Sequence, residues 1–252
     1  MADPAGSAAG SVDSTEVARF AALARRWWDP QGPMAPLHKL NPVRLGYIRD
    51  RLAQHFGRDA KSLTPFEGLS LLDIGCGGGL VSEPMARLGF AVTGIDAAGN
   101  NIAVARRHAE EAELEIDYRE AAAEDLAEAG ESYDVVLALE VVEHVADPSL
   151  FLAAACRLVR PDGAFIGATL NRTPKSFLLG IVGAEYVLRW LPRGTHRWDR
   201  FMRPSEFAAA LRGQGLALQD LTGLSYDLLA GQWRLGRDLE VNYLLHAAKF
   251  AG

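Results

Sequence analysis

The sequence predicts an α/β fold in which a mostly parallel sheet carries helices on both faces. From Ser70 onward, short apolar runs alternate with amphipathic helical stretches, as in repeated βα units. The first run, 70–74, ends in the glycine-rich stretch 75–79, and the next run ends in Asp96. A glycine turn after one strand and an acidic residue after its neighbour are typical of a nucleoside site at the carboxyl ends of parallel strands.

Composition narrows the class of protein. The 252 residues include 26 Lys and Arg against 32 Asp and Glu, a net charge of −6, with no basic block. This balance argues against a nucleic-acid partner. Two cysteines, Cys76 and Cys156, argue against a disulfide framework and suit a reducing compartment. Because no apolar run has the ~20 residues that span a bilayer, we expect a cytoplasmic protein.

The N-terminal region divides into a tail and a helical cap. Residues 1–12 are rich in Ala, Gly and Ser, which predicts a disordered tail without a signal peptide. Asp13 and Glu16 have the spacing of a capping box, so we expect a helix from Asp13 to about Trp27. Asn41-Pro42 predicts the start of a second helix, 42–56. The range 13–68 is then an N-terminal helical cap in front of a main domain, 69–252.

The main domain is predicted to contain seven strands. Strands are expected at 70–74, 91–95, 115–119, 133–138 and 163–170, with helices near 80–88, 99–111 and 148–159 between them. After this alternation an insertion over 175–200, with a helical pattern at 175–191, predicts a lid. A helix near 204–212 and strands at about 216–223 and 241–248 complete the chain.

The glycine turn favours one nucleoside cofactor. A dinucleotide site requires a third glycine where Leu80 stands. Asp73, just before the turn, would repel a pyrophosphate and attract an ammonium group. S-adenosylmethionine has an ammonium group and a ribose but no phosphate, so Asp73, Gly75, Gly77 and Asp96 are predicted to bind it. The stretch 119–125 fits either an adenine pocket or a solvated loop.

A second cluster, Glu140, Glu143 and His144, follows the fourth strand. A phenol with a pKa of ~10 must lose its proton before it can accept a methyl group at neutral pH. His144 has the pKa range of a general base for this step. Alternatively, the three side chains hold a divalent metal ion that lowers the phenol pKa. In the third interpretation His144 caps a helix and the glutamates are solvated.

Several longer motifs resemble the bacterial ubiquinone-biosynthesis O-methyltransferases over nearly all of 16–249. They lie at 26–30, 36–45, 140–145, 169–176, 182–186, 194–196 and 241–243. The resemblance implies a Rossmann-like class I methyltransferase with a seven-stranded sheet whose last strand is antiparallel. It also implies methylation of a 2-polyprenyl-6-hydroxyphenol and of a 3-demethylubiquinol.

The same resemblance assigns residues. Arg44, Gly75, Asp96 and Leu139 match positions that contact S-adenosylmethionine in the family, and the Glu140, Glu143 and His144 positions are associated with Mg²⁺ in eukaryotic relatives. On composition alone, 175–191 is a lid helix. A polyprenylated substrate instead favours peripheral contact of this segment with membrane lipid, on the inner face of the plasma membrane.

Other partners and functions are open at this point. The resemblance allows contact with other ubiquinone-biosynthesis enzymes. Methylation of a soluble catechol or other small molecule is an alternative function. A cofactor-binding scaffold of a quinone-synthesis complex is another, and it would not require Glu140, Glu143 and His144.

Overall fold

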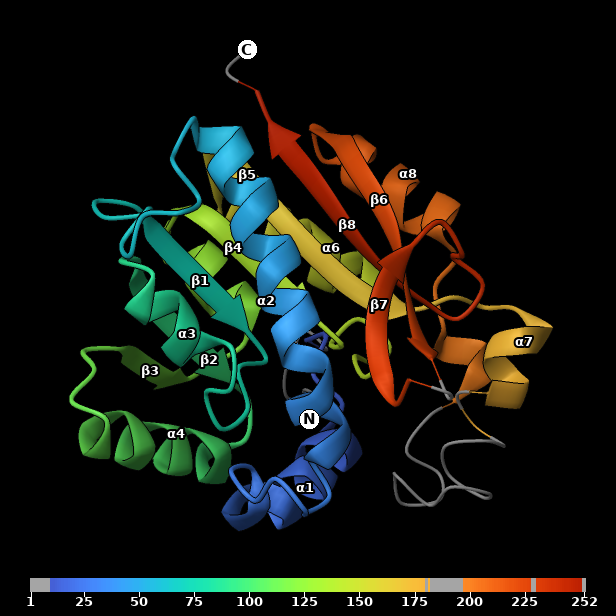
Figure 1. Ribbon diagram of the computed structural model, residues 1–252, viewed down its shortest axis with the longest axis horizontal. Coiled ribbons are helices and arrows are strands. Elements are labelled where there is room, and N and C mark those ends of the chain that lie inside the picture. Colours follow the sequence, from blue (N-terminus) through green and yellow to red (C-terminus); the bar gives the residue numbers. More distant parts are fainter. Residues whose placement is uncertain (1–9, 180, 182–196, 228–229, 251–252) are drawn as a thin grey trace, which may run out of the picture.

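A computed structural model describes residues 10–179, 181, 197–227 and 230–250. In this part of the chain one eight-stranded sheet has the order β3-β2-β1-β4-β5-β8-β6-β7 (Figure 1). The strands are β1 (Ser70–Ile74), β2 (Ala91–Asp96), β3 (Asp117–Glu120), β4 (Tyr133–Leu139), β5 (Val159–Leu170), β6 (Leu216–Asp227), β7 (Gln232–Gly236) and β8 (Asn242–Lys249).

The first five strands are parallel and the last three are antiparallel. β1 pairs in parallel with β2 and β4, and β2–β3 and β4–β5 continue the parallel part. β8 lies antiparallel between β5 and β6, as predicted for the last strand. The predicted count of seven strands is wrong because β7 pairs with β6 as an additional antiparallel strand. β7 lies at the sheet edge and is mostly exposed, so its sequence lacks the apolar alternation of a half-buried strand.

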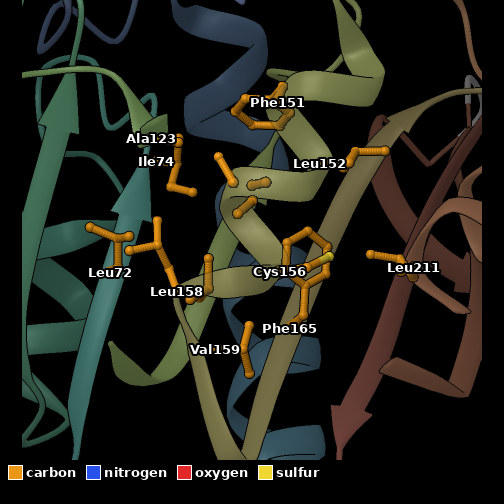
Figure 2. Close-up of a cluster of buried hydrophobic side chains, with 14 of the residues drawn as sticks. Leu72, Ile74, Ala123, Phe151, Leu152, Cys156, Leu158, Val159, Phe165 and Leu211 are labelled. Carbon is orange, nitrogen blue, oxygen red and sulfur yellow. The ribbon is translucent and has the colours of Figure 1, made fainter. Parts of the chain in front are cut away.

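Helices cover both faces of the sheet. α2 and α3 pack on one face, where Ile48, Leu52 and Met85 join a buried cluster with β-strand residues. α5, α6 and α8 pack on the other face, and Figure 2 shows Phe151 and Cys156 of α6 among the side chains of that cluster. The helices are α1 (Ser14–Leu23), η1 (Ala24–Arg26), α2 (Ala35–Phe56), α3 (Ser82–Arg87), α4 (Gly99–Glu111), α5 (Ala123–Glu128), α6 (Pro148–Arg157), α7 (Pro174–Ser176), η3 (Trp198–Arg200) and α8 (Pro204–Gly213).

Helix α2 begins seven residues before the predicted start. Met34 is its N-cap residue, and Pro36 stands in the first turn, where a missing N–H costs nothing. Pro42 lies inside the helix, so the interpretation of Asn41 as an N-cap was wrong. The Asn41 side chain is used in tertiary bonding instead, since its Nδ2 donates to the Leu80 carbonyl at 3.0 Å.

The start of the described chain also differs from the prediction. Asp13 is the N-cap of α1, and its carboxylate accepts from the backbone N–H of Thr15 and Glu16. Ser11, which we had expected in a disordered tail, is buried, and its carbonyl accepts from the Ala146 N–H at 2.6 Å. Ordered structure therefore precedes Asp13. Residues 1–9 of the predicted tail lie outside the described residues.

The predicted insertion 175–200 is described only at its two ends. Most of it, 180 and 182–196, lies outside the described residues, so the predicted helix 175–191 is not tested. The described ends are α7 and its continuation to 179, and η3. Among the helices that the structure describes, none combines the length and apolar character needed to cross a bilayer.

Candidate functional site

A cavity of about 820 Å³ lies at the carboxyl ends of the parallel strands. Residues of the helical cap line the cavity, together with residues at the ends of β1, β2 and β4. Figure 1 shows α1 and the N-terminal half of α2 at this end of the sheet. Seven of the nine predicted site residues line the cavity: Arg44, Asp73, Gly75, Asp96, Leu139, Glu140 and His144. Gly77 and Glu143 do not line it.

Gly77 is covered by the cap. Its φ of 56° is left-handed, and a Cβ there would collide with the Trp27 ring. A Cβ on Gly78 would lie 2.5 Å from the Cβ of the same tryptophan. Trp27 Nε1 donates to Asn101 Oδ1 at 2.9 Å, and Trp28 Nε1 donates to the Gly78 carbonyl at 2.9 Å. Gly77 is therefore where the cap packs on the glycine turn, and its contact with the cofactor stays a prediction.

Asp96 ends β2 beside this turn. Its carboxylate accepts from the backbone N–H of Gly77 at 3.0 Å and of Ala98 at 2.8 Å, and from Asn101 Nδ2 at 3.2 Å. Burial raises the pKa of Asp96, although these hydrogen bonds favour the ionised form. The bonds fix the orientation of a carboxylate that lines the cavity. Such a group can accept hydrogen bonds from two ribose hydroxyls.

Arg44 and Asp73 bring opposite charges to the same cavity. Burial raises the pKa of Asp73 to about 6, while Ser82 Oγ, which donates at 2.6 Å, and the Arg44 charge favour its ionised form. Arg44 is buried and donates to Asn41 Oδ1. Arg44 Nε has no hydrogen-bond partner within the described part of the chain. An ammonium group beside Asp73 and a carboxylate beside Arg44 would each meet the opposite charge.

The stretch 119–125, at the end of β3, contributes some of its residues to the cavity lining and others to the start of α5. Ala121 and Ala122 line the cavity and present small side chains, as an adenine site requires. Asp125 does not line it, because its Oδ2 accepts from the Ala122 N–H at 2.8 Å at the start of α5. Glu124 lines the cavity and accepts from the Ser11 N–H at 3.2 Å. Of the two acids, only Glu124 faces the predicted adenine pocket.

The side chains of Glu140, Glu143 and His144, which follow β4, do not point to a common centre. Glu140 has φ of 57°, a left-handed conformation that costs a non-glycine residue about 1–2 kcal/mol, and it lines the cavity. Glu143 is buried and accepts from Thr169 Oγ1 at 2.8 Å. Burial and the charge of Glu140 raise the pKa of Glu143 well above its usual range. Glu143 thus lies behind the cavity wall and does not line the cavity, and its catalytic role stays a prediction.

His144 is held by a residue from the cap. Its Nδ1 lies 2.9 Å from Glu16 Oε2, and its ring meets the Phe20 ring edge-on with centroids 5.2 Å apart. Glu16, predicted as a capping-box partner, is therefore a missed site residue. No signal in the sequence links it to a histidine 128 positions later.

These positions do not fit a metal site built from Glu140, Glu143 and His144. Glu143 points to Thr169, and His144 Nδ1 is bound to Glu16. Across the described ranges, no group of three or more His, Cys, Asp or Glu side chains is arranged to hold a metal ion.

Another part of the cavity lining is mainly apolar and lies beside the ion pair of Lys175 with Asp238. Leu170, Leu179, Leu224, Trp233 and Val241 contribute to it. Trp233 belongs to β7, the strand that the sequence analysis missed, and its ring packs against Tyr226 of β6 with centroids 5.4 Å apart. A turn with positive φ at Gly231 joins the two strands and was the available signal for this hairpin. The cavity thus joins a charged end to an apolar end.

Comparison with known proteins identifies the family. A family model described as a methyltransferase domain matches residues 72–167. The ubiquinone biosynthesis O-methyltransferase of Azorhizobium caulinodans is 59% identical over 239 residues, which cover 95% of this chain and 94% of that protein. This chain belongs to the ubiquinone biosynthesis O-methyltransferases.

Further comparisons agree with this membership. The ubiquinone biosynthesis O-methyltransferase of Paramagnetospirillum magneticum is 55% identical over 240 residues, with 95% of this chain and 96% of that protein covered. The crystal structure of magnesium protoporphyrin IX methyltransferase from Synechocystis PCC 6803, with bound SAH, shares the fold. It has a TM-score of 0.63 and 20% identity, and the match covers 94% of this chain and all of that one.

The predicted class of enzyme is confirmed. This ubiquinone biosynthesis O-methyltransferase has the Rossmann-like class I fold, with one strand more than expected. The methyltransferase domain, and the SAH bound in the magnesium protoporphyrin IX methyltransferase of the same fold, support S-adenosylmethionine as the methyl donor. The charged end of the cavity, with Arg44, Asp73 and Asp96, has the groups that such a donor needs.

Proposed function

We propose that this O-methyltransferase methylates phenolic hydroxyls of polyprenylated ubiquinone precursors, namely a 2-polyprenyl-6-hydroxyphenol and a 3-demethylubiquinol. One observation carries the proposal: a single cavity of about 820 Å³ joins charged groups suited to the methyl donor to an apolar wall, and His144 lines it as well. The names of the relatives, ubiquinone biosynthesis O-methyltransferases, support the same pathway.

We assign the charged end to the methyl donor. Arg44 holds the donor's carboxylate, Asp73 its ammonium group, and Asp96 its ribose hydroxyls. Gly75 leaves room for the donor against the backbone, and the Leu139 side chain contacts it from the end of β4. When bound, S-adenosylmethionine supplies an electrophilic methyl group on a sulfonium.

We assign His144 as the general base. With Nδ1 engaged by Glu16, Nε2 takes the proton of the substrate phenol, whose pKa of ~10 keeps it mostly protonated at neutral pH. The oxygen that loses this proton is the methyl acceptor. Glu140 stays at the cavity wall, where its charge opposes the lowering of the Arg44 pKa by burial and so favours the charged guanidinium.

The apolar wall favours a prenylated acceptor over a soluble catechol. A small catechol would leave Leu179 and Trp233 uncovered, whereas a prenyl chain buries them at about 25 cal/mol per Å² of apolar surface. The hairpin β6–β7 would then contact the first prenyl units.

Methyl transfer from labelled S-adenosylmethionine tests this function. We expect a short-prenyl catechol to be methylated with a kcat/KM at least about tenfold above that of catechol itself, because apolar burial contributes in both ground and transition state. Chelation followed by added Mg²⁺ is the second arm of the assay. Equal kcat/KM for both acceptors would favour the soluble-catechol alternative, and no product with either would favour the scaffold.

We also propose that the segment beginning at α7 contacts membrane lipid. Phe177, Leu178 and Leu179 are 47%, 57% and 47% exposed, an unusual apolar run on a protein surface. Leu179 also lines the cavity, so this run borders the apolar end where a lipid-borne substrate would enter.

Vesicle binding tests this contact. Phe177→Asp with Leu178→Asp should reduce co-sedimentation with phosphatidylethanolamine–phosphatidylglycerol vesicles at least about fivefold, since two buried apolar side chains contribute roughly 1.5–3 kcal/mol each. Leu63→Asp is the matched control, because Leu63 is 89% exposed and lies in the loop between α2 and β1, which Figure 1 shows on the opposite side of the molecule from α7. Unchanged co-sedimentation of the folded double variant would remove the proposal.

A further inference from the structure

Helix α1 supplies a carboxylate to the imidazole at the substrate site. Glu16 Oε2 lies 2.9 Å from His144 Nδ1, and the two side chains are only 16% and 15% exposed. A carboxylate accepts hydrogen bonds and cannot donate them when ionised, so Nδ1 carries the hydrogen of this bond. The neutral imidazole is thereby held as the tautomer whose Nε2 is the proton acceptor.

Several contacts fix Glu16 in this position. Arg19, one turn later on α1, forms an ion pair with the same oxygen at 2.6 Å. The helix itself is anchored at its start, where Asp13 pairs with Arg200 of η3 at 2.9 Å. The edge-on Phe20 ring limits rotation of the imidazole. The bond is therefore part of a packed contact between the cap and the loop after β4.

We propose that Glu16 is a positioning residue for methyl transfer, which holds the His144 ring in its productive tautomer and stabilises the imidazolium that forms when the phenol is deprotonated. This inference rests on the proposed role of His144 as base. The proton moves from the phenol oxygen to Nε2, the Nδ1 hydrogen stays on the ring, and Glu16 stays ionised. The positive ring and the carboxylate then form a short-range ion pair.

The electrostatics of Glu16 agree with this role. Burial alone would raise the pKa of Glu16, but the hydrogen bond and charge of His144, together with Arg19, lower it. The other charges that act on Glu16 are Asp13 on its own helix and Arg197 before η3. The ionised Glu16 in turn favours the protonated form of the His144 ring.

Glu16→Gln tests the proposal because it keeps the shape and removes the charge. We expect kcat to fall at least about tenfold, and the acid-side midpoint of the kcat/KM profile to move about one pH unit lower. The direction follows because a ring without its carboxylate loses its proton at lower pH. NMR titration of the His144 ring should show the same shift without turnover. The Kd of S-adenosylmethionine should stay within about twofold.

Two variants make the result specific. Asp50→Asn removes an exposed carboxylate elsewhere in the cap, on α2, where it pairs with Arg49, and it should leave the midpoint in place. Glu16→Asp restores a charge on a shorter side chain, so the midpoint should return while kcat stays reduced. If Glu16→Gln does not fold, an NMR midpoint in Glu16→Asp at the value of free histidine would overturn the proposal.

The outcome also separates this inference from the proposed function. A Glu16→Gln enzyme with unchanged midpoint and kcat, beside an inactive His144→Gln enzyme, would overturn the role of Glu16 alone. Activity retained in His144→Gln would instead overturn the assignment of the base.

Discussion

Replacing His144 by alanine should lower kcat by about 10²–10⁴-fold, the range that a general base contributes. The phenol then loses the base to which its proton is assigned. Because the substrate phenol has a pKa of ~10, the rate of the variant should rise about tenfold per pH unit up to that pH. Single-turnover methyl transfer across pH 6–10 measures both effects.

The methyl donor provides the control for this variant. His144 is assigned to the acceptor and not to the donor, so the calorimetric Kd of S-adenosylmethionine should change less than about twofold. His144→Gln keeps more of the contact with Phe20 and should be as slow as the alanine variant. A parallel loss of donor affinity would mean that His144 orders the cofactor site, and the assignment of the base would be wrong.

Asp96→Ala should weaken S-adenosylmethionine binding about 100-fold. Hydrogen bonds to a charged group contribute about 1.5–3 kcal/mol each, and two ribose hydroxyls are assigned to this carboxylate. The variant also loses the bonds from Gly77, Ala98 and Asn101 that order the glycine turn. Titration calorimetry gives the Kd, and kcat at saturating donor should fall only a few fold.

Asp96→Asn distinguishes the two contributions. The amide keeps the size of the side chain and one acceptor oxygen, so it preserves much of the turn while losing the charge. We expect an intermediate Kd and a melting temperature close to that of the unmodified protein. A Kd unaffected in both variants would show that the ribose is bound elsewhere.

Local sequence signals predicted the parallel core well. The strand 70–74 and the helix 99–111 have the predicted bounds, because apolar periodicity and the glycine turn act within one βα unit. Asp73, Gly75 and Asp96 were placed by the same logic, since the carboxyl ends of adjacent parallel strands meet at one edge.

Tertiary contacts explain what the sequence did not reveal. Asn41 looked like a helix cap, but a bond to the distant Leu80 carbonyl uses its amide. Glu16 looked like a capping-box residue until the fold brought His144 beside it. Glu143 was grouped with His144 because they are adjacent, yet the turn after β4 directs them to different surroundings. Spacing along the chain carries no information on such partners.

The contact of Trp27 with the glycine turn has a consequence for synthesis on the ribosome. The helical cap is synthesised before the strands and turns that it covers, because it precedes them in the sequence. Trp27 is 7% exposed in the finished protein but has no Gly77 or Gly78 to cover when it leaves the exit tunnel. Glu16 likewise cannot form its hydrogen bond until His144, 128 residues later in the sequence, has been synthesised. The nascent cap therefore carries an uncovered aromatic side chain until the glycine turn has been synthesised.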